Sequence, residues 1–546
     1  SFYLRILSDA VVRFLLKSLH LFQANVIYNS GGGFYILAPN TKQARESLNN
    51  AIAIIEEKFF EVHGTNLYVA IDAIGLSKET LLHKEGKNLG LAWEKLFQVR
   101  EKKKSSKFAN LIQSHYDKFF IPLMQGSPAE RDKITGEEIA AGEKTYKLDK
   151  IGKVKELTFQ QIELGSKLKE SDFMIVSDGE ISYWNKQISP ANLGFYYYLL
   201  RKEDIELKKE QLKASADKVS VITLNGENNS CEFIGRIKGI NGINNIYGLE
   251  FYGGNDFNGK SFDEYCDKEN EDAFKRLGVL RMDVDNLGNI FQSGILPERA
   301  TLSRYAALSR SFDYFFSGYL NTIWQDIDPD NSFIVYSGGD DVFIVGSWDV
   351  AIELAKHIRN DFREFTSQNS AFSISGGIAI ITRKFPIMKG AEESAIEEGE
   401  AKIHKCMNSN KNSISFMDMP LNWDKEFPTV ENVKNAIVRF TQNGTLPKSF
   451  ISKILSYLEN ARMINHRIMK FKVFWMLTYD LSRMRERIKD LETLSLINNC
   501  KLEICGNKDV LNGQPIESEY HPLELWAFAC RWAELEMRTG NNDNNN

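Results

Sequence analysis

Two stretches of the chain repeat one order of apolar and polar positions. Residues 26–37 read VIYNSGGGFYIL and residues 333–344 read FIVYSGGDDVFI, so each stretch places a glycine pair between two short apolar runs. Glycine tolerates positive φ, and a glycine-rich turn flanked by such runs predicts a β-hairpin. Ser30 and Ser337 align with an offset of 337 − 30 = 307 residues. We interpret the two stretches as copies of one duplicated unit.

The similarity continues beyond the hairpins. Residues 41–62 and 348–366 have apolar side chains at helical spacing. Each is followed by a run that is typical of a strand, NLYVAIDAI at 66–74 and AFSISGGIAI at 371–380. A hairpin, a helix and a strand make up half of a ferredoxin-like unit.

The turn of the second hairpin holds two adjacent aspartates, Asp340 and Asp341. Aspartate is a common turn residue, so on this stretch alone a plain hairpin explains the sequence equally well. The first copy has Gly33 and Phe34 at the same positions. One copy with both acids and one with neither favours a duplicated domain in which a single copy carries chemistry.

A further aspartate lies in an apolar run upstream. Residues 279–284 predict a buried strand that contains Asp283, and Asp285 follows on the same face. Asp285 also fits the start of an Asx-type turn. Residues 297–324 then repeat apolar side chains at helical spacing. The resulting β–α–β–β order is that of a ferredoxin-like sheet, in which the first strand lies beside the hairpin.

Asp283 can therefore converge with Asp340 and Asp341. Carboxylates held together repel one another unless cations compensate their charge. Mg²⁺ prefers oxygen ligands, commonly one or two carboxylates together with substrate phosphates. Two such ions can assist an in-line phosphoryl displacement, and the backbone of loop 285–288 can present N–H groups to a triphosphate. The pattern predicts a nucleotidyl-transfer site.

Composition narrows the protein classes that remain. The 546 residues are 43% hydrophobic and 26% charged, a globular profile for which we expect about two to four domains. No apolar run approaches the roughly 18 residues that span a bilayer. The net charge of −5 argues against non-specific coating of nucleic acid. The cysteines lack the paired spacing of a zinc site, and a reduced, cytoplasmic protein fits them best.

Several stretches of the chain occur in an order typical of one family. They are SGGGFYILAPN, DKITGEEI, RMDVDNLGNIF, LSRYAALSRSFDYFFSGYLN, YSGGDDVFIVG and SISGGIAI. Together they resemble the large subunit of type III CRISPR–Cas interference complexes of the Csm type. The resemblance implies an α+β chain with two ferredoxin-like palm domains. The implied divisions are an acid-less first palm domain at 1–100, a mixed middle domain at 101–265, a second palm domain with the GGDD motif at 266–428, and a C-terminal α-helical domain with a disordered tail at 429–546.

In that family ATP binds between the palm domains, and the second palm domain makes cyclic oligoadenylate when target RNA is captured. The resemblance implies ATP as substrate, Mg²⁺ or Mn²⁺ as cofactor, and no zinc. The implied partners are crRNA, target RNA, the repeat-tag-binding subunit and the small helical subunit, with no membrane. Asp340 and Asp341 are the implied catalytic residues, and Asp283 and Asp285 complete the implied metal ligands. The implied ATP-binding residues are Ser30, Gly31, Gly32, Gly33, Asn286, Leu287, Gly288, Ser337, Gly338, Gly339 and Lys411, the lysine being preferred to Lys402 and Lys405.

Two features depart from the family pattern. Members usually begin with an HD-type nuclease domain, whereas this chain contains no His-Asp dipeptide and starts almost directly on the first palm domain. We therefore do not expect DNA cleavage from this chain. The region before the TGEE stretch also lacks the zinc-binding cysteine cluster that the family usually carries.

Two other hypotheses remain open. Diguanylate cyclases share the glycine pair and acids, but this chain has Phe291 and Gln292 where that family has its guanine-reading Asn and Asp. It also has Val342 after Asp341, where that family has Phe, so GTP is disfavoured. A catalytically silent ribonucleoprotein scaffold is the other hypothesis, and the intact acid motifs argue against it.

Overall fold

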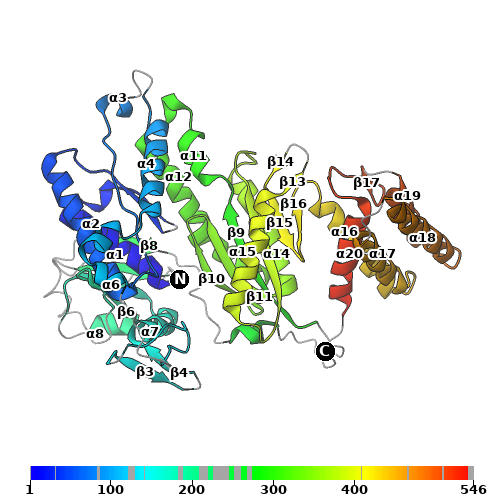
Figure 1. The fold of residues 1–546 in the computed structure, drawn as a ribbon, viewed down its shortest axis with the longest axis horizontal. Helices are drawn as coiled ribbons and strands as arrows, with labels where there is room; N and C mark the ends of the chain where they lie inside the picture. Colours follow the sequence, from blue (N-terminus) through cyan, green and yellow to red (C-terminus); the bar gives the residue numbers. More distant parts are fainter. Residues whose placement is uncertain are drawn as a thin grey trace. The chain divides into compact units, whose positions relative to one another are not determined.

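The computed structural model divides into two compact units (Figure 1). The first unit comprises Ser1–Phe257, Asn286–Tyr319 and Tyr336–Asp340, and the second comprises Asn258–Asp285, Leu320–Val335 and Asp341–Asn546. The structure describes residues 2–30, 32–82, 87–120, 130–140, 142–149, 151–181, 188–207, 219–224, 245–250, 260–266, 274–406, 409–463, 467–506 and 509–538. The predicted disordered tail lies outside the described residues, and the predicted boundaries of the four domains remain predictions.

The largest sheet in the described chain has six strands in the order β10-β11-β9-β12-β15-β16. The central strand β9 pairs antiparallel with β11 on one side and β12 on the other, while β12 and β15 are parallel. The first strand thus lies beside the hairpin, as the sequence predicts. The strands are β9 (Arg276–Val284), β10 (Ser332–Gly338), β11 (Asp341–Ser347), β12 (Ile374–Thr382), β15 (Ser413–Phe416) and β16 (Met419–Asn422).

Helices α14 (Trp348–Phe365) and α15 (Ile387–Ile403) pack on this sheet at glycines. A Cβ on Gly278 of β9 would lie 2.7 Å from the Cβ of Ala351 in α14. A Cβ on Gly377 of β12 would overlap the backbone of α15 at Glu398. The second approach brings the C-terminal half of α15 against β12, the strand that pairs with β9. The strand predicted at 371–380 and the helix predicted at 348–366 are confirmed.

The helix predicted at 297–324 is interrupted in the structure. It consists of α12 (Leu302–Asp313), a π-helical segment at Tyr314–Tyr319 and α13 (Leu320–Ile327). The hydroxyl of Ser337 donates a hydrogen bond to the carbonyl of Phe316 within the π-helical segment. A side chain that bonds to helix carbonyls in this way is one cause of a local break in an α-helical ladder. Apolar spacing alone does not reveal such a break.

The first unit begins with α1 (Phe2–Ser18) and the first hairpin, β1 (Val26–Ser30) and β2 (Gly33–Ile36), which is followed by α2 (Lys42–His63). The two hairpins share their turn geometry, because Gly32 has φ +73° and Gly339, its equivalent by the 307-residue offset, has φ +71°. The helix predicted at 41–62 is confirmed.

The strand predicted at 66–74 is wrong, because the structure assigns no strand to these residues. Ile71 is buried, and Leu67 and Val69 pack partly against the core of the unit. The alternation of apolar residues therefore reflects burial of one side of the segment, not a hydrogen-bonded ladder. Apolar alternation reports the burial of a face and does not identify a pairing partner.

An aromatic cluster joins the first hairpin to α4 and to two helices that follow β9 in the chain, α11 and α12. Tyr35 lies edge-on to Trp93 of α4 (Leu89–Ser105) at 4.3 Å between ring centroids, and Tyr28 lies 5.9 Å from Phe291 of α11 (Leu287–Ser293). Trp93 in turn lies 5.3 Å from Tyr305 of α12. These aromatic pairs hold β1 and β2 against α4, α11 and α12 within one unit.

The middle of the chain contributes a second sheet with the order β6-β5-β7-β8. Its side chains share one core with α1 and α2, including Ile6, Ile55, Met174 and Ile222. The remaining elements of this region are α3 (Lys78–Leu81), α5 (Ala109–Ser114), α6 (Tyr116–Phe120), β3 (Thr145–Leu148), β4 (Gly152–Lys155), α7 (Glu156–Glu170), β5 (Phe173–Asp178), β6 (Phe195–Leu200), α8 (Lys202–Leu207), β7 (Val219–Leu224) and β8 (Asn245–Glu250).

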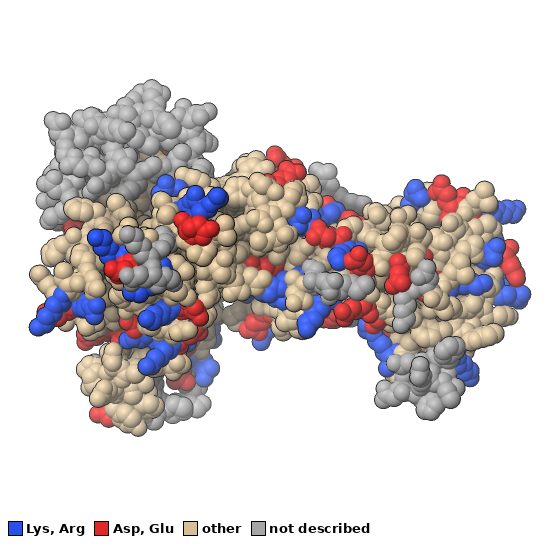
Figure 2. Space-filling model, turned by 90° about the horizontal axis from the view of Figure 1, so that it is seen from above, with Lys and Arg blue, Asp and Glu red and all other residues tan. Residues whose placement is uncertain are grey.

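The C-terminal part is helical, and α20 runs through its core with Trp526 fully buried. No helix in the described residues is long and apolar enough to cross a membrane. On the face seen in Figure 2, basic and acidic side chains of the described residues are interspersed. The elements are β13 (Lys405–Cys406), β14 (Ser409–Asn410), α16 (Phe427–Gln442), α17 (Ser449–Met463), α18 (Arg467–Arg485), α19 (Leu491–Cys505), β17 (Val510–Leu511), β18 (Gln514–Pro515) and α20 (Pro522–Met537).

Candidate metal and nucleotide site

Three aspartates converge at one end of the six-stranded sheet. Asp283 is the penultimate residue of β9 and faces Asp341, the first residue of β11, as a pair across the antiparallel ladder. Asp340 precedes Asp341 in the hairpin turn. One ligand oxygen from each of the three carboxylates lies within 4.8 Å of the others, and all three residues are partly exposed. The sequence-based expectation that these acids converge is met by this geometry.

Local sequence explains why the acids point outward together. Met282 and Val284 are buried on either side of Asp283, so the alternation of β9 leaves the aspartate on the opposite face of the sheet. Gly339 provides the positive φ that the tight turn requires. The turn then places Asp340 beside the start of β11.

Lys402, at the end of α15, is a cation paired with Asp283. Its Nζ forms an ion pair with the carboxylate of Asp283 and another, at 2.6 Å, with Glu398 one helical turn earlier. Burial alone would lower the pKa of Lys402, but the two carboxylates outweigh burial and raise it. Glu398 also contacts Arg281 of β9 at 3.3 Å. A lysine one turn after a glutamate is a helix-surface pattern, and only the tertiary fold reveals that the pair faces the acids.

Lys411, the lysine preferred from the sequence, lies beside Asp285 instead. It occupies the turn between β14 and β15 with φ +64°, and its backbone N–H donates to the carbonyl of His404 at 3.1 Å. Its charge acts on the carboxylate of Asp285. Lys402 pairs with an acid of the cluster, and the choice of Lys411 as the ATP-binding lysine remains a prediction.

Asp285 is not part of the group formed by Asp283, Asp340 and Asp341, and its predicted role as a metal ligand remains a prediction. Its exposed fraction is 1%, and one carboxylate oxygen accepts hydrogen bonds from Ser373, Ser375 and the backbone of Asn412. Burial raises its pKa, although these hydrogen bonds act in the opposite direction. A turn begins at Asp285, but its carboxylate accepts hydrogen bonds from these distant residues and not from the backbone that follows it, as an Asx-type turn would require.

The residues around the second turn have separate tasks. The side chain of Ser337 is buried and bonded to Phe316, so its hydroxyl is committed to the protein. The hydroxyl of Tyr336 donates to the carbonyl of Gly338 at 3.2 Å. Gly339 is the turn residue with positive φ. Asn286, Leu287 and Gly288 form the left-handed cap and first turn of α11, directly after Asp285.

The first hairpin belongs to the same unit as the tip of the second. Burial raises the pKa of Tyr28 in β1 well above its usual range, and the nearby carboxylate of Asp340 raises it further. Ser30 pairs with Gly33 across this hairpin, and Gly32 forms its turn. Gly31 and the side chain of Ser30 lie outside the described residues. Tyr28 is a neighbour of Asp340 that sequence reasoning missed, because its only signal is a position two residues before Ser30 and the glycine-rich turn.

A divalent cation fits the donor set at the three aspartates. The three carboxylates supply hard oxygen ligands, and their mutual repulsion is offset within the described residues by the ammonium of Lys402 on Asp283. Partial exposure leaves room for further oxygen ligands from water or a phosphate. Mg²⁺ or Mn²⁺ has this preference, whereas Zn²⁺ favours nitrogen and sulfur ligands.

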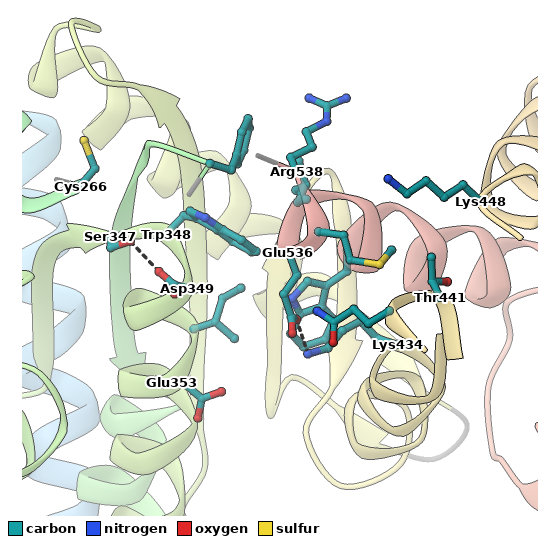
Figure 3. Close-up of a pocket in the computed structure, with 16 residues that line it drawn as sticks. Cys266, Ser347, Trp348, Asp349, Glu353, Lys434, Thr441, Lys448, Glu536 and Arg538 are labelled. Atoms are coloured by element: carbon teal, nitrogen blue, oxygen red, sulfur yellow. Dashed lines mark hydrogen bonds and ion pairs between the residues drawn. The ribbon is translucent and has the colours of Figure 1, made fainter. Parts of the chain in front are cut away.

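A separate cavity of about 670 Å³ lies elsewhere in the second unit, and none of the three aspartates lines it (Figure 3). Its wall includes Trp348 at the start of α14 and Trp532 in α20. Lys434 closes one side through an ion pair with Glu536 at 2.6 Å and a contact over the ring of Trp532 at 4.8 Å. The cavity lies where α14 meets the C-terminal helices.

Comparisons with known proteins agree with this architecture. Residues 276–415 match the second palm domain of Cas10/Cmr2, and residues 1–121 match domain B of the Csm1 subunit. The crystal structure of a Csm1–Csm4 cassette in complex with cA4 has a TM-score of 0.66 and 18% sequence identity, covering 98% of this chain and 66% of that one. The apo cassette gives a TM-score of 0.66 with 20% identity. At these identities, the structural likeness establishes the fold.

Curated relatives carry the name single-strand-specific deoxyribonuclease Cas10/Csm1 of subtype III-A. The relative from Enterococcus italicus is 28% identical over 480 residues, which is 85% of this chain and 57% of that protein. The relative from Mycobacterium tuberculosis is 26% identical over 516 residues, 90% of this chain and 59% of that protein. The relative from Streptococcus thermophilus is 35% identical over 202 residues, 35% of this chain and 25% of that protein. The chain therefore spans less than two thirds of the length of these relatives.

The sheet order, the hairpin and the converging acids define a palm domain of the Cas10/Cmr2 class. The N-terminal match and the relatives then point to one group of proteins. Over most of its length, the chain is similar to the Cas10/Csm1 large subunits of type III-A CRISPR systems.

Proposed function

We propose that this chain joins ATP into cyclic oligoadenylate by metal-dependent nucleotidyl transfer. The observation that carries the proposal is the convergence of Asp283, Asp340 and Asp341, with ligand oxygens within 4.8 Å of one another. Relatives of the same fold support the substrate class, since structures of Csm1–Csm4 cassettes are described in complex with ATP, pppApA, cA3 and cA4.

The reaction forms one phosphodiester bond for each P–O bond broken. The 3′-hydroxyl oxygen of one ATP attacks the α-phosphorus of another, the hydroxyl proton is lost to solvent or base, and pyrophosphate leaves. Bound Mg²⁺ or Mn²⁺ would polarise the α-phosphate and stabilise both the attacking and the leaving oxygens. Repeated transfer and a final intramolecular attack of the same kind close the ring.

The chain's own residues divide this work. Asp283, Asp340 and Asp341 would hold the metal, with Asp340 and Asp341 at the reacting centre. The ammonium of Lys402 would exchange its ion pair with Asp283 for a contact with the triphosphate. Its ion pair with Glu398 would hold the ammonium close to the nucleotide. Charge-assisted contacts of this kind are strong in partly buried sites.

Backbone groups would complete the nucleotide-binding site. The turn at Gly338 and Gly339 would let the main chain approach one ATP, and the equivalent glycines of the first hairpin, Gly31, Gly32 and Gly33, would face the second together with Ser30. Residues 286–288 would offer N–H groups to a triphosphate. These roles are expectations from the family resemblance.

The same proposal covers assembly. One relative of this fold is described as the Csm1–Csm4 subcomplex of the type III-A Csm interference complex. We expect this chain to associate with equivalent subunits, crRNA and target RNA, and to be active when target RNA is bound. On the face seen in Figure 2, the interspersed charges favour recruitment of RNA through the assembled complex over non-specific RNA coating.

Product analysis tests the proposal. The purified chain, alone and assembled with guide RNA, partner subunits and target RNA, is incubated with Mg²⁺ and either ATP or GTP, and the products are identified by mass spectrometry. We expect cyclic 3′–5′ oligoadenylate from ATP, and none from the double variant Asp340→Asn/Asp341→Asn. Cyclic di-GMP would favour the diguanylate cyclase hypothesis. No product from the assembled complex would favour a scaffold.

The relatives' name raises a second candidate activity, cleavage of single-stranded DNA. A fluorescently labelled DNA strand added to the same reactions tests it directly. DNA cleavage that survives Asp340→Asn/Asp341→Asn would assign that activity to another site of the chain.

A further inference from the structure

The carboxylate of Asp285 is the centre of a buried polar cluster close to the acids. Its Oδ2 accepts hydrogen bonds from Ser373 Oγ at 2.7 Å, Ser375 Oγ at 2.9 Å and the backbone N–H of Asn412 at 3.1 Å. The backbone N–H of Asp285 also donates to the carbonyl of Ser373 at 2.9 Å. Three donors on one oxygen occupy the directions from which that oxygen could bind a metal ion.

This cluster reaches Asp283 through the sheet. Ser375 of β12 is the residue directly opposite Asp283 of β9 in the antiparallel ladder. Its hydroxyl donates to Asp285, so one carboxylate ties the end of β9 to the strand beside it. The backbone that carries Asp283 is thereby fixed on its β12 side, and the turn into residues 286–288 starts from a fixed point.

The cluster also holds a strained turn. Lys411 and Asn412 have φ values of +64° and +49°, a conformation that is costly for residues other than glycine. Asp285 accepts the N–H of Asn412, while Asn422 Nδ2 and the backbone N–H of Trp423 donate to the Asn412 carbonyl at 3.2 and 2.9 Å. The turn keeps its shape because both the backbone N–H and the backbone carbonyl of Asn412 are hydrogen-bonded.

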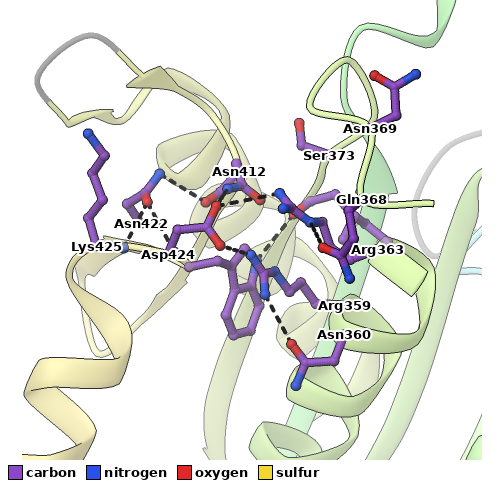
Figure 4. A network of polar contacts seen from close by, with 12 residues as sticks. Arg359, Asn360, Arg363, Gln368, Asn369, Ser373, Asn412, Asn422, Asp424 and Lys425 are labelled. Carbon is purple, nitrogen blue, oxygen red and sulfur yellow. Dashed lines mark hydrogen bonds and ion pairs between the residues drawn. The ribbon is translucent and has the colours of Figure 1, made fainter. Parts of the chain in front are cut away.

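Figure 4 shows how the contacts continue to α14. Asn412 Nδ2 donates to Asp424 Oδ2 at 2.6 Å. Asp424 forms an ion pair with Arg359 of α14, and Arg363 approaches the same carboxylate at 3.7 Å. A continuous set of polar contacts therefore links the end of β9 to a helix packed on the sheet.

We propose that Asp285 is a positioning residue for the acid cluster, acting as a hydrogen-bond acceptor and not as a metal ligand. It fixes the backbone of Asp283 and the turn at Lys411–Asn412, so that the metal ligands are held in place before the metal binds. Outer-shell partners that orient ligands in this way commonly change metal affinity or activity by about 10–100-fold when removed. The catalytic consequence rests on the proposed function, whereas the effect on metal binding does not.

Asparagine at this position separates the two roles. Its amide oxygen can accept from the same three donors, while the negative charge is lost. The amide nitrogen would replace Oδ1, which is buried without a hydrogen-bond partner. Loss of the negative charge would weaken a metal ligand strongly, whereas a hydrogen-bond acceptor would keep its three donors.

The test compares Asp285→Asn, Asp285→Ala and Asp283→Asn in the full chain. Mn²⁺ affinity is measured by isothermal titration calorimetry, thermal unfolding by calorimetry, and kcat and KM for ATP in the assembled complex. We expect Asp285→Asn to keep Mn²⁺ affinity within about threefold, Asp285→Ala to weaken it by about tenfold or more with a lower kcat, and Asp283→Asn to weaken it most. Ser375→Ala, which removes a single donor, provides a milder variant if Asp285→Ala does not fold.

Two results would overturn the proposal. Loss of Mn²⁺ affinity in Asp285→Asn equal to that in Asp283→Asn would make Asp285 a metal ligand. The role of Asp285 would be purely structural if Asp285→Ala lowered the unfolding temperature and left Mn²⁺ affinity unchanged. The same holds for Ser375→Ala where that variant replaces Asp285→Ala. If the unsubstituted complex turns over no ATP, the proposed function fails, and the Mn²⁺ measurements still decide the role of Asp285.

Discussion

Lys402 contacts two carboxylates at once, and this arrangement sets its expected behaviour. Its ammonium pairs with Asp283 and with Glu398, whose side chain is largely buried. A metal ion that binds Asp283 must compete with this ammonium for the same carboxylate. The ammonium can then serve the phosphates of a nucleotide, because Glu398 keeps it nearby.

Lys402→Met should therefore separate metal binding from nucleotide binding. We expect Mn²⁺ affinity to rise about two- to fivefold, since a competing ion pair is lost. We expect KM for ATP to rise by about tenfold or more, since a charged hydrogen bond to phosphate is lost. Calorimetry and steady-state kinetics measure the two effects, with Lys405→Met, at an exposed neighbouring position, as the control. Equal loss of Mn²⁺ and ATP binding would contradict this account.

Asp132, in the DKITGEEI stretch, gives a pH-dependent prediction. Burial would raise its pKa, but backbone N–H groups of Lys155, Thr135 and Ile134 and the hydroxyl of Thr158 outweigh burial and lower the pKa to about 2. A lowered folded-state pKa contributes stability above the unfolded value, and that stability is lost as the pH falls toward 2. The unfolding temperature of the parent chain should exceed that of Asp132→Asn at pH 7, by a margin that shrinks at pH 3. A margin that stays constant with pH would contradict the shift.

At the scale of elements, glycines set how closely helices approach the sheet. Gly377 of β12 touches the backbone of α15, whereas Gly399 within α15 has open space around its Cα. We expect Gly377→Ala to destabilise the fold by about 1–3 kcal/mol through overpacking. We expect Gly399→Ala to stabilise it by about 0.5–1 kcal/mol, because alanine is the better helix former. Chemical denaturation measures both, and destabilisation by Gly399→Ala of the same size would contradict the packing argument.

The elements also mark where sequence reasoning succeeds. Both hairpins, the helices after them and the strand with Asp283 follow from apolar periodicity and glycine placement, which are local properties. The strand expected at 66–74 does not form, because burial of alternate side chains does not require a pairing partner. The π-helical segment accepts a hydrogen bond from Ser337, which lies 21 residues beyond Phe316 in the chain, so local apolar spacing does not predict this contact.

Some features of the candidate site can likewise be predicted from the sequence, and others cannot. The convergence of Asp283, Asp340 and Asp341 follows from strand order, and the fold satisfies it. The positions of Lys402 and Asp285 depend on how α15 and the 411–412 turn pack, which no local pattern encodes. Identical residue types therefore have different tasks two positions apart.

At the scale of the molecule, a ligand that binds only the folded chain should stabilise it. At a Mn²⁺ concentration of about 100 times the dissociation constant, the stabilisation expected is about 2.7 kcal/mol. We expect Mn²⁺ to raise the unfolding temperature of the parent chain, and the rise to disappear in Asp283→Asn and in Asp340→Asn/Asp341→Asn. The same measurement with calcium, a larger cation, provides the comparison. If Mn²⁺ raised the unfolding temperature of the acid variants as much as that of the parent chain, the ion would bind elsewhere.

The most direct test of the central claim is to locate the metal. A crystal of the full chain with Mn²⁺ and a non-hydrolysable ATP analogue gives an anomalous-scattering map that identifies the ion without reference to the fold. We predict a manganese peak bound by the carboxylates of Asp283, Asp340 and Asp341, with a phosphate of the nucleotide on the same ion. A nucleotide and manganese bound elsewhere, with the three carboxylates carrying no ion, would contradict the account.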